Sequence, residues 1–362
     1  MDFDFSPEQY TLRDEARRFL EQQCPTSHVR EFIDDPAGWS RGLWKQMADL
    51  GWMALPFPED AGGLGQGFLD LVLLLGELGR VVAPVPFLSS IAQAGQVVLR
   101  HGSPEQQARF LTGIASGEQI ATVAIAEKSG SYDEAGIDTR AEQSGNAWRL
   151  TGEKRYVLDA PAADLFVVAA RTPEGARWFV VEEGAVVTPK KSFDLTRTMG
   201  TVALEDVEAV PLESGGLEPG LRICVAAACA EMVGTAAKIL DLTVGYSKER
   251  EQFGRPIGSF QAIKHKCAEM LADLEPSRSA AYYACWAVAT DADDADLAVS
   301  VAKSFGSEAL ARVAAEGVQV HGGIAFTWEH DMHLYQKRIK SMEHLFGDAP
   351  YHHERIAQLV GL

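Results

Sequence analysis

The alternation of apolar and polar residues divides the chain into stretches with different periods. From residue 6 to about residue 100 the apolar positions recur at helical spacing, as Leu12 and Ala16 do. The Ser-Pro-Glu run at 6–8 is a helix-start signal, because serine caps free N–H groups, proline suits the first helical position and an acid favours the first turn. The same signal recurs at 103–105. The first stretch is therefore predicted to be helical.

Near residue 121 the pattern changes to short runs rich in β-branched and aromatic residues. Gly, Asn, Asp and Pro separate these runs, which is typical of strands joined by turns. A linker with Gly and Pro at 212–220 ends this stretch, and helical spacing then continues to the C-terminus. The predicted strands are 121–127, 147–152, 154–158, 165–171, 177–183 and 200–210, and the predicted long helices are 68–78, 219–250, 259–290, 294–317 and 331–345.

Helices followed by strands and then by a helical bundle predict an α+β protein. A chain of 362 residues is expected to form two or three structural units. We expect an N-terminal helical domain at 1–119, a middle β domain at 120–213 and a C-terminal helical bundle domain at 214–362.

Charge and cysteine content narrow the possible partners. Lys plus Arg number 33 and Asp plus Glu number 51, so the net charge is −18, and neither nucleic acid nor anionic lipid is an expected partner. The apolar run 223–230 ends at Glu231 and is too short to span a bilayer. The N-terminus lacks the pattern of a signal peptide. Five cysteines without a CxxC pair argue against a disulfide framework, so a reduced, cytoplasmic protein is expected.

Two stretches contain residue types that could carry chemistry. The loop at 56–67 is rich in glycine, but no strand precedes it, so a phosphate cradle is not expected. The C-terminal stretch 334–355 gathers carboxylates and histidines. Its adjacent His352 and His353 cannot share a helix face, and no metal is expected there. The full set is Glu343, His344, Asp348, His352, His353 and Glu354.

Three other stretches carry a resemblance to a known family. They are LWKQMADLGWMALPFPEDAGGLG at 43–65, YSKEREQFGRPIGSFQAIKHKCAEM at 246–270 and VQVHGGIAFTWEHDMHLYQKR at 318–338. Together they resemble the signature regions of the FAD-dependent acyl-CoA dehydrogenase family. The last one resembles an actinobacterial-type subgroup that can form α2β2 heterotetramers. The resemblance covers the whole chain and implies a helical domain, a middle β-barrel or β-sandwich and a C-terminal four-helix bundle.

The activity that the resemblance implies is α,β-dehydrogenation of an acyl-CoA thioester. A carboxylate removes the α-proton, and the β-hydrogen leaves as hydride to the flavin. The resemblance also implies a FAD that lies across a subunit interface and an electron-transfer flavoprotein as electron acceptor. The residues implied for the nucleotide half of FAD are Arg250, Gln252, Phe253, Gln319, Gly322 and Gly323, and Tyr156 is implied against the flavin ring.

The sequence departs from the family pattern on the flavin-ring side. Where the family has a Thr-Glu-Pro-Gly-Ala-Gly-Ser-Asp-like loop, residues 126–133 read AEKSGSYD and lack the threonine hydroxyl. Where the family has Trp-Ile-Thr or Trp-Ile-Ser, this chain has Tyr156, Val157 and Leu158. An aromatic ring is kept, but the hydroxyl donor is lost, so a flavin held here would lose hydrogen bonds to its polar edge.

The catalytic base is also missing from its expected positions. Counting from Gln319, the family's usual glutamate falls at Phe346, which cannot accept a proton. The position used by some relatives falls at Cys224, which is not a carboxylate. Asp348 and Glu231 are the displaced carboxylates that could replace the base.

Three functions remain open from the sequence alone. The chain could be a subunit that acts with a homologous partner supplying the base, and a bulky or steroid-derived acyl-CoA is the substrate that the resembled subgroup suggests. It could be a self-sufficient homo-oligomeric dehydrogenase that uses Asp348 or Glu231. It could also be a flavin-free acyl-CoA-binding or scaffold protein, although the kept nucleotide-side residues argue against this. The acyl chain itself is not predicted.

Overall fold

The computed structural model describes residues 5–145 and 147–362. Backbone contacts divide the chain into two compact units, each made of segments that are distant in sequence. The helical unit comprises Met1–Arg30, Val72–Ala83 and Val225–Leu362, and the mixed unit comprises Glu31–Leu71 and Pro84–Cys224. This division differs from the three consecutive domains expected from the sequence, whose boundaries stay predictions.

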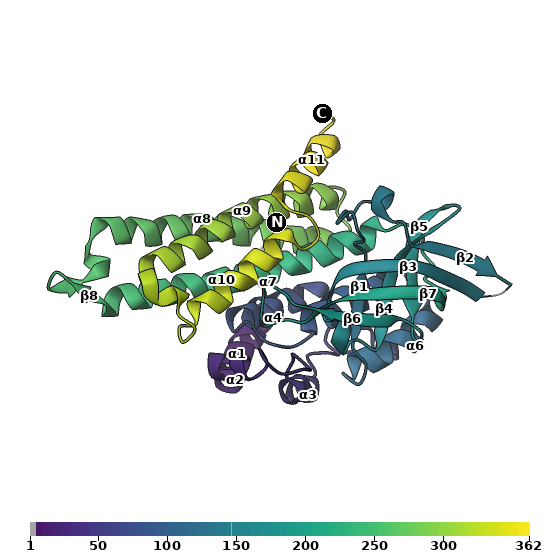
Figure 1. Cartoon of the computed structure of the whole chain (residues 1–362), viewed down its shortest axis with the longest axis horizontal. Helices are drawn as coiled ribbons and strands as arrows, with labels where there is room; N and C mark the ends of the chain where they lie inside the picture. The colour runs from purple at the N-terminus through teal and green to yellow at the C-terminus, as the bar shows by residue number, and fades with distance from the viewer. Residues whose placement is uncertain (1–4, 146) are drawn as a thin grey trace. The chain divides into compact units, whose positions relative to one another are not determined.

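The helical unit is a bundle of long helices (Figure 1). The central helix α9 packs against α8, α10 and α11, and a two-stranded hairpin joins α7 to α8. Its elements are α1 (Pro7–Gln23), α2 (Thr26–Glu31), α4 (Phe68–Arg80), α7 (Glu218–Glu249), β8 (Glu251–Gln252), β9 (Arg255–Pro256), η5 (Ile257–Ser259), α8 (Gln261–Ala289), α9 (Ala295–His321), η6 (Gly322–Phe326), α10 (Met332–His344) and α11 (Ala349–Leu359), of which α2, α4 and α7 extend into the mixed unit.

Glycines let α4 and α7 approach closely inside the helical unit. A Cβ added to Gly234 would lie 1.9 Å from the carbonyl oxygen of Gly76, and one added to Gly79 would lie 2.3 Å from that of Glu231. Neither position has room for a side chain. Substitution by alanine would therefore push the two helices apart.

Helix α7 is by length and composition apolar enough to cross a membrane. It has 32 residues, and 89% of its most apolar 18-residue stretch is buried inside the protein. A long, buried, apolar helix is what the centre of a helical bundle requires.

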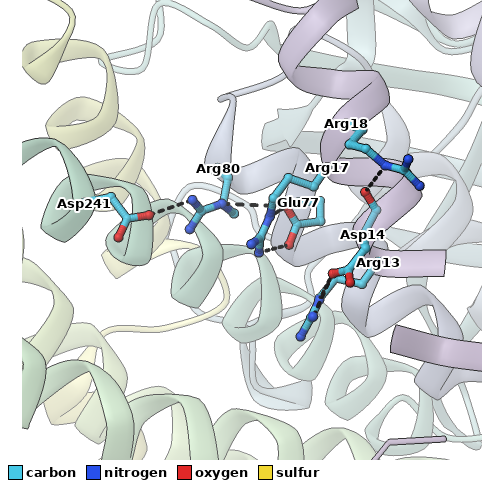
Figure 2. A network of polar contacts seen from close by, with 7 residues as sticks. All are labelled: Arg13, Asp14, Arg17, Arg18, Glu77, Arg80 and Asp241. Carbon is cyan, nitrogen blue, oxygen red and sulfur yellow. Dashed lines mark hydrogen bonds and ion pairs between the residues drawn. The ribbon is translucent and has the colours of Figure 1, made fainter. Parts of the chain in front are cut away.

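An ionic network links α1, α4 and α7 in the helical unit (Figure 2). The guanidinium of Arg17 donates to both carboxylate oxygens of Glu77, at 2.9 and 2.7 Å. Nε of Arg80 lies 3.6 Å from Oε2 of Glu77, and Nη2 of Arg80 donates to Asp241 at 2.6 Å. Because Glu77 is buried, its charge requires these two arginines. The network borders a groove of about 480 Å³.

The mixed unit contains a closed β-barrel. Its strands β4, β2, β3, β7 and β5 pair in that order, and β5 pairs back with β4, so the ring closes. Strand β1 adds to β4 in parallel, and β6 adds to β7. Leu150, Val168, Phe179 and Val202 fill the interior. The strands are β1 (Ala121–Ala124), β2 (Arg140–Ser144), β3 (Ala147–Leu158), β4 (Leu165–Thr172), β5 (Gly175–Val181), β6 (Val186–Lys190) and β7 (Met199–Pro211).

Short helices complete the mixed unit. The predicted helix start at Ser103 is present as a capping box, in which Ser103 and Gln106 exchange hydrogen bonds between side chain and backbone. An equivalent capping box at Ser6 starts α1 in the helical unit. The helices are α3 (Arg41–Asp49), η1 (Glu59–Ala61), the π-helix η2 (Leu88–Ala94), α5 (Gly95–His101), α6 (Pro104–Ala115), η3 (Glu134–Gly136) and η4 (Ala160–Ala162).

Candidate functional site

Three of the predicted nucleotide-side residues lie on the hairpin between α7 and α8. Gln252 pairs with Arg255, which leaves Phe253 and Gly254 as a two-residue turn. The φ angles are 54° at Phe253 and 76° at Gly254, as a type I′ turn requires. Phe253 is 93% exposed. A bulky residue rarely adopts positive φ, so this turn presents an aromatic ring to a ligand or partner at the expense of backbone strain.

The third hairpin residue, Arg250, carries a guanidinium that is free to bind an anion. Its side chain is exposed and has no hydrogen-bond or ion-pair partner within residues 5–145 and 147–362. Its backbone is fixed, because its N–H donates to the carbonyl of Tyr246 and its carbonyl accepts from the N–H of Ile257, both at 2.8 Å. A fixed backbone with an unpaired planar fork suits a diphosphate.

The second predicted element is the end of α9. Gln319 is exposed there and has no side-chain partner in the described part of the chain. Gly322 has φ 68° and ψ −149°, a region that is essentially restricted to glycine. A Cβ at Gly322 or Gly323 would meet no atom within 4 Å. The backbone at these glycines is therefore open to close approach.

The two elements meet at one end of the helical unit. The ring of Tyr246, in the last turn of α7, stacks on His321 at the end of α9 with 4.5 Å between centroids. This end therefore combines an exposed aromatic ring, an unpaired guanidinium, a free amide and open glycine backbone. That donor set fits the adenine and diphosphate of a dinucleotide.

On the flavin-ring side, Tyr156 lies in the mixed unit at a β-bulge. The pairing of β3 with β7 shifts register between Lys154 and Val157, and Tyr156 has φ 57°. Its side chain is 55% exposed. A bulge re-aims a side chain out of the regular alternation, and this one turns Tyr156 to the surface of the barrel.

A buried ion pair anchors the loop at 126–133 beside this strand. Lys154 donates to Glu127 at 2.6 Å and to the carbonyl of Ile125 at 3.0 Å, while Glu127 accepts the N–H groups of Asp138 and Thr139. Burial lowers the pKa of Lys154 to about 8, although Glu127 opposes that shift. The pair is therefore charged at neutral pH, and the loop is held at its base.

The two candidate bases both have structural partners in the helical unit. Asp348 is the N-cap of α11 and accepts the N–H of Tyr351 at 3.1 Å. Glu231 and Arg338 are buried to 1% and 0% exposure and form an ion pair at 2.5 Å. Each carboxylate is therefore already engaged by a structural partner. Their assignment as bases stays a prediction.

The turn between α10 and α11 contains Phe346, the expected base position. Phe346 is buried and has φ 61°, and Gly347 follows with φ 99°. The ammonium group of Lys303, on α9, donates to the carbonyls of Glu343 and Gly347 at 2.8 Å each. Nε2 of His352 lies 3.0 Å from the carbonyl of Phe346 and must donate to it. Three carbonyls of this turn are thus fixed by buried side chains.

Several of these supporting residues were not anticipated from the sequence. Lys303 offered the clearest signal, since it is a lysine inside the apolar stripe of a helix that the pattern predicts to be buried. For His352 the sequence favours a solvated or capping group over a metal ligand, but it does not identify the carbonyl of Phe346 as the partner. Lys154 and Arg338 gave no local signal, because their partners lie in other elements. In the described ranges no group of three or more His, Cys, Asp or Glu residues could hold a metal ion.

Comparison with known proteins decides the family. Models of the acyl-CoA dehydrogenase N-terminal, middle and C-terminal domains match residues 6–118, 122–210 and 221–361. Acyl-CoA dehydrogenase FadE27 of Mycobacterium tuberculosis is 32% identical over 99% of this chain and 98% of its own length. The chain belongs to the acyl-CoA dehydrogenase family. The α+β fold class and the resemblance found in the sequence are confirmed.

Two solved structures are particularly similar to this chain. The ChsE4–ChsE5 complex from Mycobacterium tuberculosis contains a chain that is 32% identical, with a TM-score of 0.93 and full coverage of both chains. A variant of the Tcur3481–Tcur3483 steroid ACAD contains a chain that is 30% identical, with a TM-score of 0.91 and coverage of 98% and 97%. Acyl-CoA dehydrogenases are FAD-dependent oxidoreductases, so this chain carries the scaffold of a flavin enzyme.

Proposed function

We propose that this chain is a subunit of a heteromeric acyl-CoA dehydrogenase and that it completes a flavin site shared with a homologous partner. The observation that carries the proposal is the asymmetry between its two half-sites. The nucleotide side presents unpaired Arg250 and Gln319 with exposed Phe253, whereas the flavin-ring side has lost two hydroxyl donors. A chain that contributes only the nucleotide half of the site needs the nucleotide-side residues but not the flavin-ring hydroxyl donors.

In this proposal each nucleotide-side residue has a defined role. Arg250 binds the diphosphate, Gln252 and Gln319 donate or accept hydrogen bonds, and Phe253 lies against the adenine. Gly322 and Gly323 allow backbone N–H groups to approach the cofactor. Tyr156 would contact the flavin ring only in the second, weaker site that this chain's own barrel forms. The bound FAD supplies the hydride acceptor.

The base is proposed to come from the partner subunit. Phe346 cannot take the α-proton, and neither can a buried Cys224, whose thiol pKa is raised by burial. Asp348 and Glu231 are engaged as a helix cap and an ion-pair partner. The remaining contribution of this chain is to bind and orient the cofactor.

The proposed substrate is a steroid-derived or otherwise bulky acyl-CoA. One similar structure supports this, because it is named as a steroid ACAD. We also propose an electron-transfer flavoprotein as the acceptor that reoxidises the flavin. A cytoplasmic location fits the five cysteines, since none of them forms a disulfide in the described structure.

Purification of the chain alone and with a co-expressed homologous subunit tests the proposal. We expect a colourless, inactive chain that becomes a yellow, active complex. Asp348→Asn and Glu231→Gln in this chain should leave the turnover of folded complex unchanged, because neither residue serves as the base. A yellow chain that is active alone and loses activity with either substitution would contradict the proposal.

A further inference from the structure

The short helix α2 is tied to the segment that follows the open glycines, although the two lie about 300 residues apart in sequence. Nη1 of Arg30 donates to the carbonyl of Trp328 at 2.7 Å, and Nη2 donates to that of His330 at 3.1 Å. The same guanidinium bonds Oδ1 of Asp331 through Nη2 at 2.9 Å and Nε at 3.3 Å. The hydroxyl of Thr26 donates to Oδ2 of Asp331 at 2.6 Å.

Asp331 is used in an unusual way. It is the N-cap residue of α10, where an aspartate normally accepts the free N–H groups of the first turn. Here the side chain forms no such bond, and the ring of His330 accepts the N–H of Met332 instead. Both oxygens of the Asp331 carboxylate point to α2. The Asp331 carboxylate therefore does not cap α10 and instead connects the preceding segment to α2.

The segment is also held from within the bundle. The ring of His330 makes an edge contact with His321 at 5.0 Å, and His321 in turn stacks on Tyr246. Between His321 and Asp331 lie Gly322, Gly323 and the large side chains of Phe326 and Trp328. Phe326 is 78% exposed and Trp328 is 52% exposed. Inside the segment Ala325 is buried and the ring of Trp328 stacks on His333 with 5.1 Å between centroids. The polar contacts of Asp331 add to these in holding its end.

We propose that Arg30 and Thr26 are positioning residues for the nucleotide half of FAD. Through Asp331 they fix residues 322–331, so that the glycine backbone keeps one arrangement before the cofactor arrives. A preformed site avoids the entropic penalty of ordering the segment on binding, and its loss weakens affinity without removing any direct contact. This inference rests on the proposed function, because it concerns the same site.

The test measures the affinity of the full-length complex for FAD, with ADP as a competing probe. Asp331→Asn and Thr26→Val should each weaken both ligands, Asp331→Asn by about tenfold. Thr26→Ser keeps the hydroxyl and should restore the affinity. The spectrum of the flavin that remains bound should not change, because Arg30, Thr26 and Asp331 are not proposed to contact the flavin ring. The matched control is Asp273→Asn, since Asp273 also receives a two-point contact from an arginine, Arg312, in the same unit.

The outcomes separate this inference from the function on which it rests. One outcome is that Arg250→Ala abolishes FAD binding while Asp331→Asn binds FAD and ADP as tightly as the wild type. In that case Arg30 and Thr26 are not positioning residues, and the proposed function stands. If Asp273→Asn weakens FAD as much as Asp331→Asn does at equal thermal stability, the effect is general destabilisation and the inference fails. If the wild-type complex binds no FAD, both proposals fail.

Discussion

At the scale of single residues, the molecule depends on buried polar side chains that the local sequence does not explain. Lys303 is 1% exposed, and its ammonium group is satisfied by Ser307 and by two carbonyls of the turn at 343–347. Its burial lowers its pKa to about 8, so it stays mostly protonated at neutral pH. The sequence shows a lysine in an apolar stripe, but the two carbonyls that it binds belong to residues 343 and 347, distant in sequence, and could not be inferred.

Replacing Lys303 by methionine should destabilise the protein strongly. The change keeps the length of the side chain but leaves the carbonyls of Glu343 and Gly347 without their donor, and we expect a loss of about 2 to 4 kcal/mol in the free energy of unfolding. Urea denaturation measures this loss. Lys340→Met is the control, because Lys340 forms only a partly exposed pair with Glu343 and should change stability by less than about 0.5 kcal/mol. Equal losses in both variants would contradict the assigned role of Lys303.

The buried histidines should make stability depend on pH in a defined direction. Burial lowers the pKa of His352 to about 3, with the charge of Lys303 adding to the effect, and burial lowers the pKa of His101 to about 4. The unfolded chain binds these protons near pH 6.5, whereas the folded protein does not. Stability is therefore complete above about pH 6.5 and falls as the pH drops towards 4, by up to about 1.4 kcal/mol per pH unit for each histidine.

The variant His352→Gln separates this contribution from that of other groups. Glutamine can still donate to the carbonyl of Phe346, but it does not titrate. Unfolding free energies measured from pH 7 to 4 should show a shallower slope in the variant than in the wild type. Parallel slopes would mean that His352 binds its proton equally well in the folded and unfolded protein, which would contradict the lowered pKa.

At the scale of elements, helix starts and strand runs were predictable because their signals are local. The capping boxes at Ser6 and Ser103 begin α1 and α6 as the Ser-Pro-Glu runs predict. The bulge that turns out Tyr156 was not predictable, because it arises from a register shift against β7. The strain at Phe253 could be suspected only from its neighbour Gly254, which suits a tight hairpin turn.

The hairpin turn yields a prediction that separates backbone strain from binding. Phe253→Gly removes the ring but suits the positive φ at this position, so stability should be unchanged or slightly higher. The affinity of the complex for FAD should fall by about 1 to 3 kcal/mol, the usual value of a base stacked on an aromatic ring. Phe253→Tyr is the control and should keep most of the affinity. If Phe253→Gly binds FAD normally, Phe253 does not contact the adenine.

At the scale of the whole molecule, the sequence predicted the fold class and the family but not how the chain is grouped. Residues 1–30 and 72–83 join the C-terminal helices in one compact unit, although the linear pattern assigns them to an N-terminal domain. Two of the ion pairs inside this unit join Arg17 to Glu77 and Arg30 to Asp331. Pairs this far apart in sequence leave no periodic signal in a single chain, and so neither they nor the grouping could be predicted.

Our central proposal is that this chain binds the nucleotide half of a FAD whose flavin ring is bound by a homologous partner subunit. The flavin content of the purified heteromeric complex tests it most directly, with Arg250→Ala and Tyr156→Ala introduced separately into this chain. We predict one FAD for each pair of different subunits, lost with Arg250→Ala and kept with Tyr156→Ala. Flavin that survives Arg250→Ala but is lost with Tyr156→Ala would contradict the account.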